Sequence, residues 1–421
     1  MRTRRALVDR FASVREATER LAAPLSPEDQ QLQSMPSCSP TKWHRAHTTW
    51  FFETFVLLPR GVPPFKAGYD LLFNSYYESA GPRHERPLRG MLSRPGAGEI
   101  AQYRRAVDGR VTEVILGADD AQLEALAPVV ELGIAHEEQH QELLLTDILH
   151  AFSLHPHHPA YRQSGWPAAN RPASWTPITF QRFDGGLHEA GVSGDGFCFD
   201  NERPRHKIHV APFELGSRLV TNRELKAFIG DDGYRTPSLW LSDGLDFVRK
   251  AGIQAPLHSR MEGGALVLFT LDGEREARDA DPVSHVSYYE ADALARYLGA
   301  RLPTEFEWEV AAAGRPVSGN LLETQALAPV APDQTTGAAP AQLFGDVWEW
   351  TSSSYDPYPG FRPTEGMLGE YNGKFMVNQK VLRGGSCLTP AAHIRASYRN
   401  FWYPDTRFQM TGLRLARDGS R

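Results

Sequence analysis

Cysteine is scarce in this 421-residue chain, in which Cys38, Cys198 and Cys387 lie far apart. Three separated thiols do not make a disulfide framework, so we expect a cytoplasmic protein in a reducing compartment. No apolar run approaches the roughly 20 residues that a membrane-spanning helix needs. The basic residues near the start precede no apolar stretch, so no signal peptide is expected.

Basic residues are not in excess either, because 45 lysines and arginines face 51 acidic residues and the net charge is −6. Nucleic acids and anionic membrane surfaces attract proteins with a clustered positive charge. Neither is therefore an expected partner of this chain.

The two halves of the chain differ in hydrophobic pattern. Up to residue 155, apolar residues recur at helical spacing, and four helices with one long connection over 59–95 predict a four-helix bundle. Residues 156–177 are rich in proline and histidine and are expected to form a linker. Short β-like segments between turn residues predict a loop-rich α+β domain over 178–421. Its alanine-rich stretch 326–341 is expected to be a surface loop.

Several elements can be placed from local patterns. Apolar stripes predict an N-terminal helix through Leu7, Phe11, Val14 and Ala17, and two longer helices over 102–116 and 120–151. In the second half we expect helices over 221–229, 288–298 and 304–313, the last with Thr304 as N-cap and Glu307 at the third helical position. The clearest strand signals are 207–210, 265–270 and 381–383.

His136 and His140 are the strongest chemical signal in the chain. Histidines at this spacing lie on one helix face about a turn apart, so both can reach one ion. Leucines and Asp147 share that face, which turns the pair toward the interior of the bundle, where metal sites of such bundles are built. Two imidazoles alone suit iron, zinc, copper and nickel alike.

The same residues, with Glu137, also satisfy the H-E-x-x-H pattern of zinc hydrolases, in which the glutamate is the general base. The longer form of that pattern needs glycine and histidine where this chain has Leu143 and Thr146. A downstream glutamate ligand is also missing before Glu189. The zinc hydrolase is therefore the alternative interpretation.

A third ligand is expected from another helix, over residues 42–53. His47 lies on one stripe with Trp43, Trp50 and Thr54 and should face the core, while His44 is the alternative ligand. Three histidines on one side of an ion leave positions open for substrate and O2, as in the facial triads of non-haem Fe(II) oxygenases.

Longer motifs make the chain similar to a known family. The first half resembles a DinB-like bundle. The second resembles a C-type-lectin-like, formylglycine-generating-enzyme-type α+β domain, through the motifs PVSHVS at 282–287, RLPTEFEWE at 301–309, GDVWEWT at 345–351 and LRGGS at 382–386. In this order, with His47, His136 and His140, the two domains resemble the ergothioneine-pathway sulfoxide synthases.

That resemblance implies an O2-dependent oxidoreductase with an Fe(II) cofactor, which joins a cysteine-type thiol to hercynine and leaves a sulfoxide. Formylglycine-generating enzymes share the second domain but use a cysteine pair near the last motif. Only Cys387 stands there, which argues against their activity and suggests a buried small residue. A selenosugar donor, giving a C–Se bond, is the related alternative.

The resemblance also implies substrate residues. The family's tyrosine proton donor is expected at Tyr76 or Tyr77, with Tyr355 and Tyr358 as alternatives in the substrate site. Arginine holds carboxylates bidentately, so the candidates for that role are Arg83, Arg86 and Arg89.

Hercynine is expected to meet Gln139 and Asn400, while Phe401 and Trp402 could face its trimethylammonium group. Members that use γ-glutamylcysteine carry an aspartate two residues after the asparagine. This chain has Trp402 there, which favours free cysteine.

Overall fold

A computed structural model describes residues 3–77, 80–162, 174–194, 196–332, 340–365, 369 and 372–419. The chain folds into two compact units, the first mainly Met1–Tyr161 and the second Arg162–Thr364 with Asn372–Arg421. The division between them falls within 156–177, the predicted linker, of which residues 163–173 lie outside the described residues. The predicted domain limits themselves stay a prediction.

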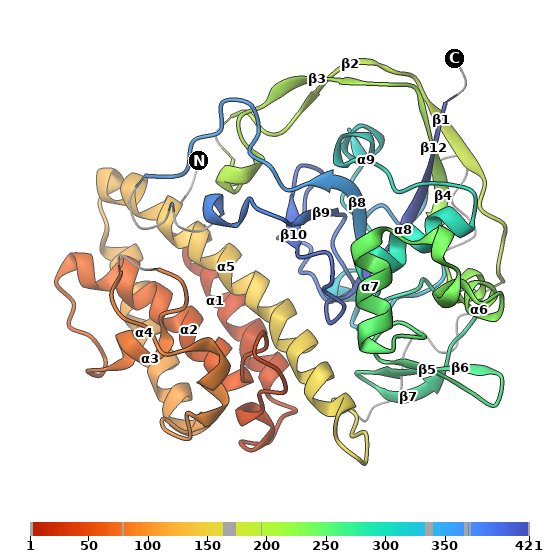
Figure 1. Ribbon diagram of the computed structural model, residues 1–421. Helices are drawn as coiled ribbons and strands as arrows, with labels where there is room; N and C mark the ends of the chain where they lie inside the picture. The colour runs from red at the N-terminus through yellow and green to blue at the C-terminus, as the bar shows by residue number, and fades with distance from the viewer. Residues whose placement is uncertain are drawn as a thin grey trace. The chain divides into compact units, whose positions relative to one another are not determined.

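The first unit is a bundle of four long helices, α1 (Arg4–Ala22), α2 (Thr41–Phe52), α4 (Ala97–Gly117) and α5 (Asp120–Ser153). Both α1 and α2 pack against α4 and α5 (Figure 1). The short α3 (Tyr69–Phe73) lies in the long connection between α2 and α4. The four-helix bundle predicted from the hydrophobic pattern is confirmed, with helix ends within a few residues for α5.

Local sequence explains where α5 begins. Asp119 accepts a hydrogen bond from the backbone N–H of Gln122, and the Gln122 side chain accepts from the Asp119 backbone, so two N–H groups at the helix start are satisfied. Helix α2 continues directly into a π-helical turn over Glu53–Leu57. Such turns are rare and often lie beside functional residues.

Gly133 allows α2 and α5 to approach closely, just before His136. A methyl group at this position would lie 2.5 Å from a ring carbon of Phe52 and 2.8 Å from one of Phe51. Rings in a packed core cannot yield that much space without a shift of the backbone. The glycine therefore helps to set the separation between the helices that carry His47 and His136.

We predict that Gly133→Ala costs about 1–3 kcal/mol of stability, because it overpacks this helix contact. It should also weaken metal binding, since α2 must move away from α5. Gly109→Ala in α4 is the matched control: outside the neighbouring residues and the backbone of its own helix, no atom lies within 4 Å of the added methyl, so the helix should gain about 0.5–1 kcal/mol. Thermal unfolding of both variants checks this, and equal stability of the two would contradict it.

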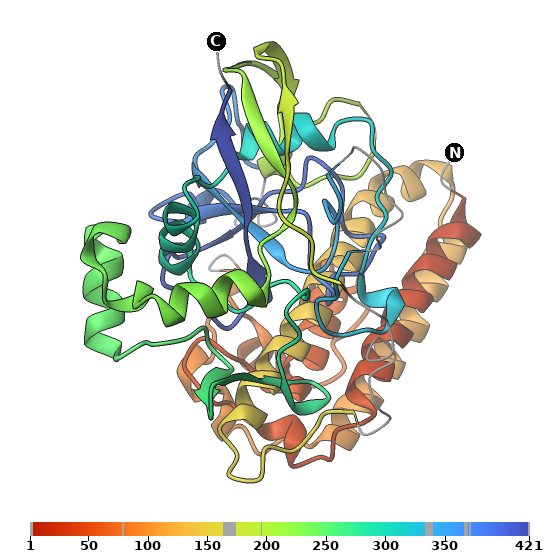
Figure 2. The same cartoon turned by 90° about the vertical axis from the view of Figure 1, so that its right-hand side faces the viewer.

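The second unit contains several small sheets. One sheet orders its strands β1-β4-β12 and another β10-β9-β8-β11, while β2 pairs with β3, and β5, β6 and β7 form a meander (Figures 1 and 2). The strands are β1 Phe180–Phe183, β2 Gly186–Ala190, β3 His206–Val210, β4 Phe213–Leu219, β5 Ser259–Glu262, β6 Ala265–Thr270, β7 Gly273–Glu276, β8 Trp348–Ser354, β9 Lys380–Arg383, β10 Asn400–Trp402, β11 Thr411–Gly412 and β12 Arg414–Asp418. The described helices of this unit are α6 Asn222–Gly230, α7 Ser242–Ala251, α8 Tyr288–Tyr297 and α9 Glu305–Ala312.

Most element predictions for this unit are confirmed, including the cap of α9, where the hydroxyl of Thr304 accepts from the N–H of Glu307. Helix α7 was missed because it begins with Ser-Asp-Gly, which reads as a turn. The surface-loop prediction for 326–341 is wrong for its described start: Ala326, Leu327 and Ala328 are buried there. Within the described residues, no helix has the length and hydropathy to cross a membrane.

Candidate metal centre

His47, His136 and His140 meet inside the bundle. One nitrogen from each ring can be chosen so that all three lie within 4.8 Å of one another. The ring centroids are 4.6–4.9 Å apart. His47 and His136 expose 0 % and 1 % of their surface, and His140 keeps some exposure over the whole residue. The three side chains thus converge from α2 and α5 on one point.

His47 is held in one orientation. Its Nδ1 lies 2.6 Å from the carbonyl oxygen of Phe73, so Nδ1–H donates there and Nε2 keeps the lone pair. Trp43 and Trp50 stack on its ring, with centroids at 4.5 and 5.6 Å. Nε2 is buried and has no hydrogen-bond partner in the part of the chain that the structure describes. A buried nitrogen without a partner is costly unless an ion fills the place.

All three imidazoles are neutral at pH 7. Burial lowers the pKa of His136 to about 3 and the pKa of His47 and His140 well below 6.5. Neutral imidazole is the form that binds metal ions. The donor set, the burial and the fixed lone pair of His47 together fit a single transition-metal ion.

Glu137 points away from this cluster. Its Oε2 lies 2.6 Å from Arg15, and its Oε1 lies 2.8 Å from Arg104 and 2.6 Å from the hydroxyl of Thr18. Burial opposes its ionisation, but the two guanidinium groups prevail and lower the pKa of Glu137 to about 2. A glutamate held between two arginines cannot take a proton from a metal-bound water, so the general-base role required by the zinc hydrolase interpretation has no support in the geometry.

Sequence reasoning missed both arginines. The buried stripe of α1 runs through Leu7, Phe11, Arg15 and Thr18, and Val14 and Ala17 are only half-buried. Arg15 follows Phe11 by about one helical turn on α1, and Arg104 follows Ile100 by the same spacing on α4, so a charged residue at a core position was the signal in each helix.

His44, the alternative ligand, lies outside the cluster. Its Nε2 is 3.0 Å from the Asp147 carboxylate and its Nδ1 is 2.8 Å from Nδ1 of His140. Both nitrogens therefore have partners, which leaves His47 as the residue of α2 that completes the group.

Tyr77 is linked to the histidine cluster through Trp50. The side chain of Asn74 bonds to both the N–H and the carbonyl of Tyr77, at 3.3 and 2.9 Å, and fixes its backbone. The Tyr77 ring is fully buried and contacts Trp50, whose indole stacks on His47. Tyr76 stacks on Tyr77 at 4.7 Å and is half-buried. The segment that orients His47 through Phe73 thus also positions this tyrosine pair.

The three candidate arginines differ sharply in burial. Arg83 and Arg86 are exposed and donate to the backbone carbonyls of Ser75 and Ser37. Arg89 is 3 % exposed and lies 3.4 Å above the ring of Trp43. It donates to the hydroxyls of Ser39 and Ser75, both at 3.0 Å. Burial and repulsion from Arg86 lower the pKa of Arg89 to about 8.

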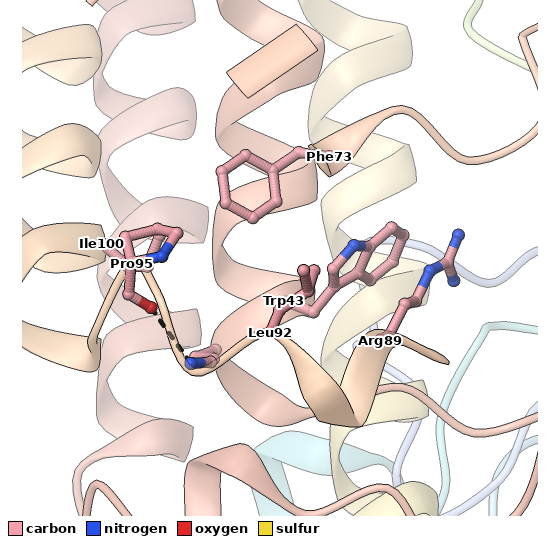
Figure 3. A pocket seen from close by; sticks show the side chains of 7 residues that line it. Trp43, Phe73, Arg89, Leu92, Pro95 and Ile100 are labelled. Atoms are coloured by element: carbon pink, nitrogen blue, oxygen red, sulfur yellow. Dashed lines mark hydrogen bonds between the residues drawn. The ribbon is translucent and has the colours of Figure 1, made fainter. Parts of the chain in front are cut away.

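Arg89 also lines a small pocket on the α2 side of the bundle (Figure 3). Its walls are the side chains of Trp43, Phe73, Leu92, Pro95 and Ile100, with Lys42 donating to the carbonyl of Pro95 at 3.0 Å. The lining holds two basic side chains and no acidic one.

Sequence similarity to known proteins extends over nearly the whole chain. Residues 10–144 match the DinB superfamily, and residues 179–326 and 322–419 match the sulfatase-modifying factor enzyme 1-like domain. The hercynine oxygenase of Mycolicibacterium smegmatis is 33% identical over 457 residues, which cover 99% of this chain and 100% of that protein. The chain belongs to the hercynine oxygenase family.

Two further proteins show how far the similarity extends along the chain. The hercynine oxygenase of Mycolicibacterium thermoresistibile is 33% identical and covers 92% of this chain and 89% of its own length. The formylglycine-generating enzyme of Streptomyces coelicolor is 29% identical over only 56% of this chain, covering 88% of that protein. The resemblance and the fold class drawn from the motifs are confirmed. Cys387 is fully buried, as expected.

Within the second unit of this hercynine oxygenase family member, Asn400, Phe401 and Trp402 form β10. Phe401 stacks on Tyr355 at 4.0 Å, and Trp402 packs edge-on against Phe408 at 5.4 Å. The side-chain oxygen of Asn400 accepts from the N–H of Phe401. All three are half-buried, so each keeps surface that a ligand could contact. Their substrate roles, like that of the half-buried Gln139 on α5, stay predictions.

Tyr355 and Tyr358 are buried in a polar network of the same unit. The hydroxyl of Tyr355 accepts from Asn201 at 2.9 Å, and Tyr358 lies between Glu305 and Arg383, at 3.3 and 3.1 Å. Burial raises the pKa of both phenols. Glu305 comes from the motif RLPTEFEWE and Arg383 from the motif LRGGS. In this hercynine oxygenase family member, the two motifs therefore form the polar network around the Tyr358 hydroxyl.

Proposed function

We propose that this protein is a non-haem iron(II) sulfoxide synthase that couples cysteine to hercynine with O2. The observation that carries the proposal is the cluster of His47, His136 and His140 in a chain of the hercynine oxygenase family. The reaction is balanced without a further reductant: the C–H of the hercynine imidazole, the S–H of the thiol and O2 give the C–S bond, the sulfoxide oxygen and water.

The three histidines would hold the metal ion, which supplies binding of the thiolate and activation of O2. Neutral imidazoles leave the full positive charge on the ion, and a positive centre favours a thiolate over a thiol. Imidazole ligands also suit zinc, but Glu137, held by Arg15 and Arg104, is not available as the base that the zinc hydrolase pattern requires. The chain's ligand set therefore fits oxidative chemistry better.

Arg89 is the arginine best suited to hold a substrate carboxylate. It is a buried cation bonded to two neutral hydroxyls. Its guanidinium lies 3.4 Å above the Trp43 ring, and that ring stacks on His47 at 4.5 Å, so one indole separates Arg89 from the cluster. A carboxylate here would replace weak neutral partners with a charge-assisted pair.

We predict that Arg89→Ala raises KM for one of the two amino-acid substrates by about 10- to 100-fold, the loss of one buried charge-assisted interaction. The kcat should change less, and Fe(II) affinity should stay unchanged. Arg86→Ala is the matched control, because Arg86 is exposed and donates to a backbone carbonyl. Steady-state kinetics on both substrates checks this, and a larger effect from Arg86 or Arg83 would assign the carboxylate to the exposed loop.

Tyr77 is the preferred proton donor because it is fixed by Asn74 and lies beside Trp50. We predict that Tyr77→Phe keeps the fold and the metal but shifts the product from the sulfoxide conjugate toward the sulfinic acid of the thiol. Tyr76→Phe provides the comparison. Product analysis by mass spectrometry decides between them: an unchanged ratio in Tyr77→Phe together with a shifted ratio in Tyr76→Phe would move the role to Tyr76.

The decisive test of the function is turnover. The protein is loaded with Fe(II) without oxygen, mixed with hercynine and a donor, and then exposed to O2, with products read by mass spectrometry. The donors are cysteine, γ-glutamylcysteine and a selenosugar. We expect the cysteine sulfoxide conjugate as the main product, because Trp402 replaces the aspartate of the γ-glutamylcysteine branch. No conjugate with any donor would overturn the proposal.

A further inference from the structure

His44 and Asp147 form a hydrogen-bonded chain that ends on one of the three clustered histidines. Asp147 follows His140 on the same helix, α5, and His44 precedes His47 on α2. All of these contacts lie inside the first unit. His44 is 2 % exposed and Asp147 6 %, so water competes little for their bonds.

The contacts of the chain determine which atoms can donate. The carboxylate of Asp147 accepts, so His44 donates through Nε2–H across 3.0 Å. In the tautomer of His44 that carries its proton on Nε2, Nδ1 accepts across the 2.8 Å contact between the two Nδ1 atoms, and His140 donates. This arrangement places the proton of His140 on Nδ1 and leaves the lone pair on Nε2.

Asp147 is itself held in place. The backbone N–H of Ser39, just before α2, donates to its Oδ2 at 2.7 Å. Nε2 of His44 bonds to the same oxygen, and the Cys38 thiol also interacts with the carboxylate, which raises the pKa of that thiol in addition to the effect of burial. Asp147 is thus held against the start of α2.

His47 on α2 and His140 on α5 are both held in one orientation, but by different kinds of hydrogen-bond partner. His47 is oriented by a backbone carbonyl, that of Phe73, which no side-chain substitution removes. His140 is oriented by side chains alone. We propose that His44 and Asp147 are positioning residues that hold His140 in the tautomer and orientation in which Nε2 binds the metal ion, and that they set the strength of that bond.

This inference rests on the proposed function only for the three histidines as metal ligands. Groups that orient a metal-binding histidine through its other nitrogen commonly contribute 10- to 100-fold in metal affinity. His44→Phe fills the same space but cannot accept the proton of His140. His44→Asn keeps an oxygen near the position of Nδ1 and should still accept it.

The test uses Co(II) as the probe, with the full chain titrated by absorbance and followed by the hyperfine-shifted N–H signals of the bound imidazoles. We expect His44→Phe to weaken Co(II) binding about 10- to 100-fold and to lose the slowly exchanging N–H signal of His140. His44→Asn should bind within about threefold of the unchanged protein. His150→Phe, on α5 and bonded to Ser34 instead, is the matched control and should bind normally.

Two failures can be told apart. If His140→Ala weakens Co(II) binding but His44→Phe does not, the positioning role is overturned while the metal site stands. If His140→Ala binds Co(II) as tightly as the unchanged protein, the metal site itself is wrong. Thermal unfolding of the metal-free variants separates both results from a general loss of fold, and His44→Asn supplies a second variant if His44→Phe does not fold.

Discussion

Replacing His136 with alanine is expected to lower the Fe(II) affinity more than about a hundredfold and to bring sulfoxide formation below detection. Removing a group that merely orients a ligand costs up to about a hundredfold, so losing the ligand itself should cost more. His136 is 1 % exposed and lies 4.9 Å from His47 between ring centroids, so no solvent-exposed group can take its place. His47→Ala and His140→Ala should behave alike.

His150→Ala is the control for this prediction, because His150 also lies on α5 but bonds to the hydroxyl of Ser34. It should retain the iron content and the turnover of the unchanged protein. Metal analysis after Fe(II) loading and gel filtration gives the comparison. A His136→Ala protein that retains one iron per chain would show that the metal binds elsewhere.

The second large effect is on stability. Glu137→Gln is expected to lower the free energy of unfolding of the first unit by about 3–5 kcal/mol, since it removes the charge shared by two buried guanidinium groups. Arg15 keeps Asp108 and Arg104 keeps Glu19 as outer partners. The inner N–H groups that face Glu137 lose their ionised acceptor where water cannot replace it, because Arg15, Arg104 and Glu137 are each 3 % exposed or less. Enzyme that remains folded should keep its turnover within about threefold, because Glu137 faces away from the histidines.

Glu53→Gln is the matched control. Glu53 is buried in the same bundle but accepts from two neutral donors, the hydroxyl of Tyr103 and the N–H of Phe65, both at 2.7 Å. Its loss should cost about 1 kcal/mol, the scale of a neutral hydrogen bond. Denaturation at constant pH measures both. A stable Glu137→Gln protein that binds metal but no longer turns over would return the glutamate to a chemical role.

The sequence was sufficient to place the site residues whose spacing follows the helical repeat. His136 and His140 share a face because of their spacing, and the Trp43, His47 and Trp50 stripe placed His47 toward the same interior. The bundle followed from the same periodicity. The motifs of the second half identified its domain type, which the match over 179–419 confirms.

Contacts between helices could not be predicted in this way. Spacing on α2 does not fix its rotation, so His44 and His47 were both possible until the structure placed His44 against Asp147. The pattern H-E-x-x-H reads Glu137 as catalytic, but whether that side chain faces the metal depends on Arg15 and Arg104, which come from two other helices. Likewise, Arg89 is buried whereas Arg83 and Arg86 are exposed. The sequence does not show this difference, because all three lie in one connection between helices.

The most direct test of the account is a crystal structure of the Fe(II)-loaded protein with hercynine, grown without oxygen, with anomalous scattering recorded at the iron edge. We expect one iron peak at about 2 Å from Nε2 of His47 and His140 and from one nitrogen of His136. The hercynine imidazole should lie on the same ion. An iron peak away from these three histidines, or hercynine bound far from it, would contradict the account.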